Sequence, residues 1–248
     1  MLEGRHALVT GGGTGIGLSI ARALAEAGAS VTICGRRAEV LEAAGAPLHP
    51  QVMDVTDEAS VRTGIAAVTA ARGPVQILIA NAGLARPAQF PDISLEDWRQ
   101  SLAANLDGAF LTTREVLPAM LDAGWGRVIA ISSIAGVKGM KRAAPYVAAK
   151  HGLVGLMRAL SADHLAQPVT FNALCPAYVD TDIVAQNVAR VMQREGLDRD
   201  AATALVHSAN PHGRLIPPED IARAALWLCG PGSDSINGQA IQISGGEF

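Results

Sequence analysis

The sequence predicts an α/β fold, in which one domain (residues 1–248) forms a doubly wound, seven-stranded parallel sheet with helices on both faces. Three observations predict it. Short apolar runs alternate with longer segments of helical pattern, which is the order of repeated β-α-β units. Several runs are apolar throughout, as strands buried on both faces require. The 248 residues are 49% apolar and 17% charged, which excludes a disordered chain.

Seven short runs are the expected strands. One of them, at 77–80, reads Ile-Leu-Ile-Ala without a polar residue. Such a run fits a central strand better than the surface of a helix. The expected strands cover residues 7–10, 31–35, 51–54, 76–81, 127–132, 170–175 and 240–244.

Helices are expected between the strands. Residues 17–27 are rich in Ala and Leu and are followed by Gly28, a suitable C-cap. Ser94 is the expected N-cap of a helix that carries acidic residues in its first turn and continues to about residue 120. Two more helices are expected over 146–165 and 217–228.

Residues 182–210 interrupt this rhythm. Val184, Val188, Val191 and Met192 recur there at helical spacing, in a segment too long for a simple connection. We expect a helical lid over a ligand crevice, because α/β sheets bind ligands at the carboxyl ends of their strands. The alternative is a surface helix without that role.

Charge and cysteine content exclude several classes of partner. The net charge of −3 does not indicate a nucleic-acid partner. Cys34, Cys175 and Cys229 lack metal-ligand spacing and fit unpaired residues of a reducing compartment. No apolar run approaches a membrane span, and the first strand leaves no room for a signal peptide. We therefore expect a cytoplasmic protein with no membrane partner and no metal.

A glycine-rich turn, TGGGTGIG, directly follows the first expected strand at residues 10–17. Its spacing, GxxxGxG, falls on Gly11, Gly15 and Gly17. Glycines at a strand-to-helix turn let a pyrophosphate approach the backbone, and the helix N-terminus attracts the anion. Glycine also serves plain turns, but this position in a β-α-β unit favours a dinucleotide site.

Two arginines, Arg36 and Arg37, follow the second expected strand, with no acid before Glu39. An acid there binds the ribose hydroxyl of NAD, whereas arginine accommodates the 2′-phosphate of NADP. Arginines at a helix N-terminus oppose the helix dipole unless an anion is bound. NADP is the favoured cofactor, with NAD and a solvated surface as the alternatives.

Candidate catalytic residues lie in the segment 127–150. Ser133 ends a strand, and Tyr146 and Lys150 lie four residues apart, on one face of the expected helix. A tyrosine with its ordinary pKa near 10 is a poor catalyst at neutral pH, and a nearby ammonium favours the phenolate. Individually these residues fit packing or a solvated surface, and only the combination is specific.

The chain resembles the short-chain dehydrogenase/reductase (SDR) family over its whole length. The resemblance implies a Rossmann fold and an NAD(P)-dependent oxidoreductase that interconverts secondary alcohols and ketones. The order and the intervals of the motifs agree with the family. The matching pieces are TGGGTGIG at 10–17, Asp54-Val55, Asn81-Ala82-Gly83, Asn105, Ser133, Tyr146-x-x-x-Lys150, Cys175-Pro176 and Ser244-Gly245-Gly246.

The resemblance also implies roles. Tyr146 would be the general acid–base, Lys150 would lower its pKa and bind the nicotinamide ribose, and Ser133 would polarise the carbonyl. Asn105 would hold a water of a proton relay. Without the resemblance, Asp54 fits a turn former, Thr181 fits a helix N-cap and Asn105 fits an amide inside a helix. The cofactor-binding residues expected in all are Gly11, Thr14, Gly15, Ile16, Gly17, Arg36, Arg37, Asp54, Val55, Asn81, Gly83, Tyr146, Lys150, Val179 and Thr181.

Within the family the chain looks most like 3-hydroxybutyrate and 3-hydroxyacyl-CoA dehydrogenases. The residues that hold a free carboxylate in the former are replaced by Ala85, Ala135 and Ala143. A small carboxylate would lose its charge-assisted hydrogen bonds there. We expect a 3-hydroxyacyl or 3-ketoacyl thioester; a xenobiotic or secondary-metabolite ketone, or a hydroxy acid, remains the alternative. An inert, cofactor-sensing protein would lack one of the catalytic residues.

The family resemblance points to a homotetramer. The helices expected over 98–120 and 146–165 carry apolar residues on more than one face. One face can pack on the sheet, which leaves another for a second subunit. These apolar residues include Leu102, Leu106, Phe110, Leu153, Leu156 and Leu160.

Overall fold

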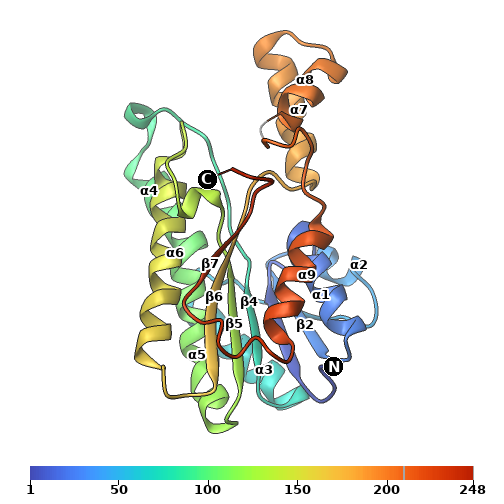
Figure 1. Cartoon of the computed structure of the whole chain (residues 1–248), viewed down its shortest axis with the longest axis vertical. Helices are drawn as coiled ribbons and strands as arrows, with labels where there is room; N and C mark the ends of the chain where they lie inside the picture. The colour runs from blue at the N-terminus through green and yellow to red at the C-terminus, as the bar shows by residue number, and fades with distance from the viewer. Residues whose placement is uncertain (209, 248) are drawn as a thin grey trace.

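A seven-stranded parallel sheet forms the centre of the molecule (Figure 1). The computed structural model describes residues 1–208 and 210–247, except for the side chains of 182–187. The strand order is β3-β2-β1-β4-β5-β6-β7, and each neighbouring pair is parallel. The strands are β1 (His6–Thr10), β2 (Ser30–Gly35), β3 (His49–Val52), β4 (Ile77–Ala80), β5 (Gly126–Ile131), β6 (Val169–Pro176) and β7 (Ala240–Ile243).

All seven expected strands are confirmed, but β3 begins two residues earlier than predicted. It is an edge strand that pairs only with β2, and its residues alternate between half-buried and exposed. Val52, for example, is 54% exposed. An apolar run marks a strand only where both faces are covered, so the apolar criterion misplaced this one.

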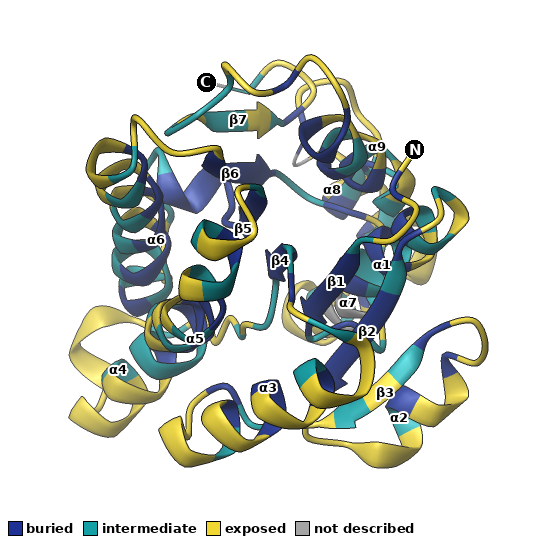
Figure 2. Cartoon of the chain, turned by 90° about the horizontal axis from the view of Figure 1, so that it is seen from below, coloured by how far each residue is buried: buried dark blue, intermediate teal, exposed yellow. Residues whose placement is uncertain are grey.

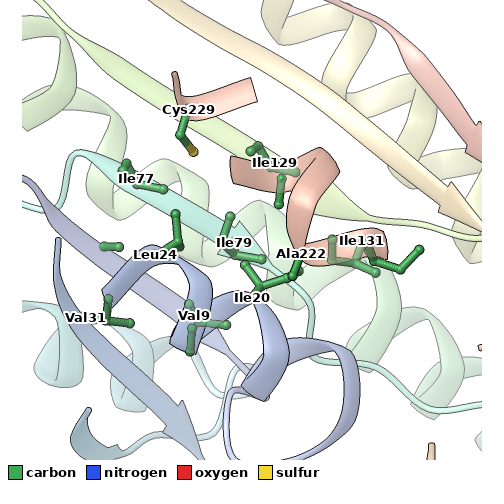
Figure 3. Close-up of a cluster of buried hydrophobic side chains, with 14 of the residues drawn as sticks. Val9, Ile20, Leu24, Val31, Ile77, Ile79, Ile129, Ile131, Ala222 and Cys229 are labelled. Atoms are coloured by element: carbon green, nitrogen blue, oxygen red, sulfur yellow. The ribbon is translucent and has the colours of Figure 1, made fainter. Parts of the chain in front are cut away.

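Helices cover both faces of the sheet. On one face α1 (Gly15–Glu26) packs against α9 (Pro218–Cys229). Figure 3 shows the apolar core beneath them, where Val9 and Ile79 of the sheet lie near Ile20 of α1 and Ala222 of α9. The other face carries α3 (Glu58–Arg72), α5 (Gly108–Asp122) and α6 (Ala144–Asp163). The central strands are buried, while the outer faces of the helices are exposed (Figure 2).

The helix expected from Ser94 to about residue 120 is interrupted. Ser94 caps α4 (Leu95–Leu102) as predicted, in a capping box with Asp97. A π-helical turn (Ala103–Asp107) then separates α4 from α5. Such turns are frequent at functional sites, and this one contains Asn105.

The helical insertion predicted after β6 consists of two helices, α7 (Asp182–Glu195) and α8 (Arg199–His207). They project beyond the carboxyl ends of the strands (Figure 1). Val188 of α7 and Ala202 and Val206 of α8 form a small apolar cluster of their own. The side chain of Val184 lies outside the described residues. A lid role for this helical pair stays a prediction.

The strand order reverses between β1 and β4, which are neighbours in the sheet although β2 and β3 lie between them in the chain. A crevice at the carboxyl ends of such strands is the usual ligand site of doubly wound sheets. The glycine turn follows β1, and Asn81 and Gly83 follow β4, so both segments reach this crevice. No helix among the described residues is long and apolar enough to span a membrane.

Candidate active site

The glycine turn is packed too tightly for side chains. A Cβ added to Gly17 would lie 2.5 Å from both the Gly11 carbonyl oxygen and Asn81 Nδ2. Gly11 and Gly15 have positive φ, +62° and +53°. Thr14 is the N-cap of α1 but its side chain makes no capping hydrogen bond, so the first-turn N–H groups remain open to an anion.

Asn81 ties the glycine turn to the end of β4. Its Nδ2 donates to the Thr10 and Gly11 carbonyls at 2.9 and 3.2 Å. Its own N–H donates to Thr10 Oγ1 at 2.9 Å. The side chain expected to contact the cofactor therefore also holds the turn in place. Ile16, partly buried, packs against the α1–α9 core.

Arg36 and Arg37 lie where β2 ends and α2 (Ala38–Ala43) begins. Both are exposed, and neither side chain forms an ion pair or a hydrogen bond to the described part of the chain. Two free cations at the carboxyl edge of the sheet fit the predicted contact with a ribose phosphate. They fit a solvated surface as well, so the assignment stays a prediction.

Asp54 and Val55 occupy the next strand end, and each has a structural task. Asp54 Oδ1 accepts hydrogen bonds from the N–H and hydroxyl of Thr56, at 2.9 and 2.8 Å. This is the turn that Asp54 alone suggests. Val55 is buried and leaves no room for a side chain on Gly108, whose Cβ would lie 2.8 Å away. A contact of Asp54 or Val55 with the adenine would be a second role beside these structural ones.

Ser133, Tyr146 and Lys150 meet at the carboxyl end of β5. Ser133 is the N-cap of a short 3₁₀ turn (Ile134–Gly136), and its hydroxyl accepts from the N–H of Ala135 at 3.1 Å. Lys150 is 4% exposed, and its Nζ donates to the Ile131 carbonyl at 2.8 Å. The same Nζ lies 5.6 Å from the centre of the Tyr146 ring.

Burial dominates the electrostatics of this group. It lowers the pKa of Lys150 to about 8. Burial also raises the pKa of Tyr146, while a hydrogen bond from Ser133 acts in the opposite direction. The sequence interpretation expected Lys150 to lower the pKa of Tyr146. The net shift of the Tyr146 pKa is upward, because desolvation of the phenol is its largest cause. The effect of Lys150 on this pKa stays a prediction.

Asn105 is buried in the π-helical turn and holds the segment that follows β4. Its Nδ2 donates to the carbonyls of Leu84 and Ser101 at 2.8 and 2.9 Å, and its Oδ1 accepts from the Leu84 N–H at 3.2 Å. The amide is satisfied by the backbone, which is the task expected of a helix-interior amide. The water relay stays a prediction.

Gly83 lies between Asn105 and Lys150. A Cβ at this position would be 2.5 Å from Asn105 Oδ1 and 3.6 Å from Lys150 Nζ. The backbone after β4 can approach the catalytic group this closely only because the residue is glycine.

Val179 and Thr181 follow β6 and lead into α7. Val179 pairs with Ile216 in an isolated bridge, which anchors the root of the helical pair. Thr181 is the N-cap of α7, and its Cγ2 would lie 3.2 Å from a Cβ on Gly15. The start of α7 therefore packs against the glycine turn.

The three alanines expected to form an apolar wall are not equally placed. Ala135 is fully buried, whereas Ala85 is exposed and Ala143 is half-buried as the N-cap of α6. Only Ala85 and Ala143 offer surface to a substrate. Lys138 and Glu247, which sequence reasoning did not pair, form an ion pair near the same edge of the sheet.

Comparison with known proteins identifies the chain. The family model described as short chain dehydrogenase matches residues 5–191. This chain belongs to the short-chain dehydrogenase family. The dehydrogenase is 36% identical to an acetoacetyl-CoA reductase of Rhizobium meliloti, with 98% of each chain covered. It is 34% identical to a D-beta-hydroxybutyrate dehydrogenase of Cupriavidus necator, over 99% of this chain and 98% of the relative.

A solved structure of an actinorhodin polyketide ketoreductase variant with NADPH matches the dehydrogenase with a TM-score of 0.94 and 34% identity. The match covers 99% of this chain and 98% of that one. The dehydrogenase therefore has the Rossmann-type fold of the family and is an NAD(P)-dependent oxidoreductase. Its uncapped α1 N-terminus and the glycine turn, which a Cβ would fill, fit the pyrophosphate of that cofactor.

Proposed function

We propose that this short-chain dehydrogenase interconverts a 3-ketoacyl and a 3-hydroxyacyl thioester with NADP(H). The observation that carries the proposal is the meeting of Ser133, Tyr146 and Lys150 beside the glycine turn. Two similar proteins, an acetoacetyl-CoA reductase and a polyketide ketoreductase, are named for keto substrates and support this choice.

Each catalytic side chain has a task in reduction of the ketone. The Tyr146 hydroxyl donates the proton to the carbonyl oxygen, and in alcohol oxidation the phenolate takes it back. The Ser133 hydroxyl donates a hydrogen bond to the same oxygen and stabilises the charge that develops there. Lys150 binds the nicotinamide ribose, and Asn105 holds a water that relays the proton from solvent. The bound nicotinamide supplies the hydride for reduction and accepts it in oxidation.

The remaining residues bind the rest of the cofactor. The backbone of the glycine turn, Gly11 to Gly17 with Thr14 and Ile16, holds the pyrophosphate. Arg36 and Arg37 bind the 2′-phosphate, which is why we assign NADP and not NAD. Asp54, Val55, Asn81 and Gly83 border the adenosine, and Val179 and Thr181 bind the carboxamide.

The free hydroxy acid is the second candidate substrate, because a hydroxybutyrate dehydrogenase is among the relatives. The half-buried Ala143 and the exposed Ala85 supply no charge for its carboxylate.

The experiment compares acetoacetyl thioester, free acetoacetate and a cyclic ketone with NADPH and with NADH, following absorbance of the reduced nicotinamide. We expect the highest kcat/KM for the thioester with NADPH. Turnover of the cyclic ketone alone would overturn the thioester assignment, and a higher value for acetoacetate would favour the hydroxy acid.

We also propose a cytoplasmic homotetramer. An apolar groove between α5 and α6 faces outward, and Phe110 in it is 44% exposed. A second subunit would cover this groove. Light scattering at micromolar concentration should give four times the chain mass, and Phe110→Glu should lower the measured mass. A monomeric wild type would contradict the assembly.

The cytoplasmic location is proposed because the three free, buried cysteines agree with a reducing compartment. Thiol labelling in intact cells should find the cysteines reduced, and disulfides would contradict the location.

A further inference from the structure

The C-terminal tail places a carboxylate beside the catalytic loop. Lys138 lies five residues after Ser133, in the loop that joins β5 to α6, and it forms an ion pair with Glu247. Because β6 lies between β5 and β7, this pair spans the carboxyl end of β6. Figure 1 shows the chain after β7 returning across the carboxyl ends of the strands toward α6.

Tyr178, which follows β6, lies within electrostatic range of both charges. Burial and the Glu247 carboxylate raise the pKa of Tyr178, whereas the Lys138 ammonium acts in the opposite direction. The backbone of Tyr178 is fixed, because its N–H and carbonyl bond to the buried Asn210 at 3.1 and 2.9 Å. The ion pair therefore neighbours a residue of fixed backbone, in the segment between β6 and α7.

The tail leaves the Glu247 carboxylate incompletely hydrogen-bonded. The Ser244 hydroxyl donates to the Glu247 carbonyl at 2.8 Å, but Gly245 and Gly246 stand between them with positive φ. Glycine adopts such φ values without a steric penalty, and the backbone of Gly245 packs against the ring of His212 too closely for a side chain. Moreover, Oε2 of Glu247 is buried and has no hydrogen-bond partner in the described part of the chain. A buried carboxylate oxygen without a partner weakens the resting contact.

We propose that Lys138 is an anion-binding residue of the substrate cleft, and that Glu247 occupies it until an anionic group of the substrate displaces the tail. The oxygens of a phosphate or of a carboxylate share the required chemistry. The proposal rests on the thioester function above, because a phosphopantetheine arm carries a phosphate. The tail acts as an internal competitor that lowers the apparent affinity for anionic substrates.

The test compares substrates that differ only in charge. Acetoacetyl-phosphopantetheine and acetoacetyl-pantetheine differ by the phosphate, and acetoacetate and its methyl ester differ by the carboxylate. Glu247→Gln should lower KM for the charged member of one pair about fivefold, as expected for a partly exposed ion pair, and leave the neutral member unchanged. The pair that responds identifies the anion. A response in neither pair, or an equal change in charged and neutral substrates, would overturn the proposal.

Two further variants distinguish displacement of Glu247 by a substrate anion from a simple loss of packing. Lys138→Gln should raise KM for the charged substrate about tenfold or more, as loss of a charge-assisted hydrogen bond predicts. Adding Glu247→Gln to Lys138→Gln should then change nothing, because the competitor has lost its site. Glu3→Gln is the matched control, since it removes an ion-paired carboxylate near the amino end of β1, at the edge of the sheet opposite the site. If Lys138→Gln and Glu247→Gln had additive effects on KM, displacement of Glu247 by the substrate would be overturned.

Binding of phosphopantetheine to the enzyme saturated with NADP⁺ keeps this test separate from the thioester function. Calorimetry should show tighter binding to Glu247→Gln than to wild type. If this holds while no thioester is turned over, the anion site stands and the proposed function fails. If thioesters are turned over but binding is unaffected by Glu247→Gln, the anion site is wrong.

Discussion

The Lys150 ammonium lies 5.6 Å from the centre of the Tyr146 ring and donates a 2.8 Å hydrogen bond to the Ile131 carbonyl. This contact joins the end of β5 to the first turns of α6. Lys150 is almost completely buried without a carboxylate partner in the described chain, and the hydrogen bond to a neutral carbonyl does not offset the loss of hydration. Burial accordingly lowers the pKa of Lys150 to about 8 from its ordinary value of 10.5.

This shift makes stability depend on pH. Between pH 8 and 10.5 the folded protein has released the Lys150 proton while the unfolded chain still binds it. Lys150 therefore makes the free energy of unfolding rise with pH in this window, by at most about 1.4 kcal/mol per pH unit, and this contribution is lost as pH falls through 8. The raised pKa values of the buried cysteines oppose the rise above pH 9, and that of Tyr146 opposes it above pH 10.

Urea unfolding of the ligand-free enzyme from pH 8 to 10 measures the slope. Lys150→Met should remove the Lys150 part of it, and the two proteins should differ most at the lower pH. Identical slopes in wild type and Lys150→Met would show that Lys150 is not responsible.

The close approach of Gly83 to Asn105 gives a second prediction. Gly83→Ala should reduce kcat at least about tenfold, because its Cβ would meet Asn105 Oδ1 at 2.5 Å and displace the amide or the backbone beside Lys150. It should also cost about 1–3 kcal/mol of stability, as overpacking does. Gly139→Ala is the control, since a Cβ there meets nothing within 4 Å. If both variants behave like wild type, the packing at Gly83 has no catalytic importance.

The cofactor assignment predicts an unequal effect of arginine removal. Arg36→Ala and Arg37→Ala should reduce kcat/KM for NADPH about tenfold to more than a hundredfold, since a charge-assisted contact contributes about 1.5–3 kcal/mol. The values for NADH should change little. Arg22→Ala, which removes another exposed arginine on α1, serves as the control. A wild-type preference for NADH would place both arginines in solvent.

The chain lacks the polar side chains that bind a substrate carboxylate in hydroxybutyrate dehydrogenases, so adding a positive charge at one of these positions tests their importance. Ala143 is half-buried at the start of α6, three residues before Tyr146. Ala143→Lys should raise kcat/KM for free 3-hydroxybutyrate about tenfold, as expected for one new charge-assisted contact. Ala143→Met supplies similar length without the charge and should not raise it. High activity of the wild type on the free acid would show that its carboxylate is bound elsewhere.

Much of the fold is predictable because two-sided burial leaves a clear pattern. Strands β1, β4 and β5, whose central residues are apolar, are fully buried, and each was expected within a residue or two. The exposed edge strand β3 lacks that pattern and was misplaced. No bounds were predicted for α3, one of the helices expected between strands, although Asp57 caps it and Val61, Ile65 and Val68 recur on its buried face.

The candidate site was predictable where motif spacing carries chemistry, as for Ser133, Tyr146 and Lys150. Its physical environment was not. The direction of the Tyr146 pKa depends on desolvation by residues distant in sequence. The π-helical turn at Asn105 depends on contacts with the segment after β4. Likewise Lys138 and Glu247 meet only because β5 and β7 lie on either side of β6, and no local pattern marks the pair.

The role of Tyr146 is tested most directly by Tyr146→Phe. The measurement is the NADPH-dependent reduction of acetoacetyl thioester by wild type and variant, with NADPH binding measured in parallel. The account predicts that the variant binds NADPH as wild type does and loses at least about a thousandfold in kcat, because general acid–base catalysis of this size depends on the phenol. Near-wild-type turnover by Tyr146→Phe would contradict it.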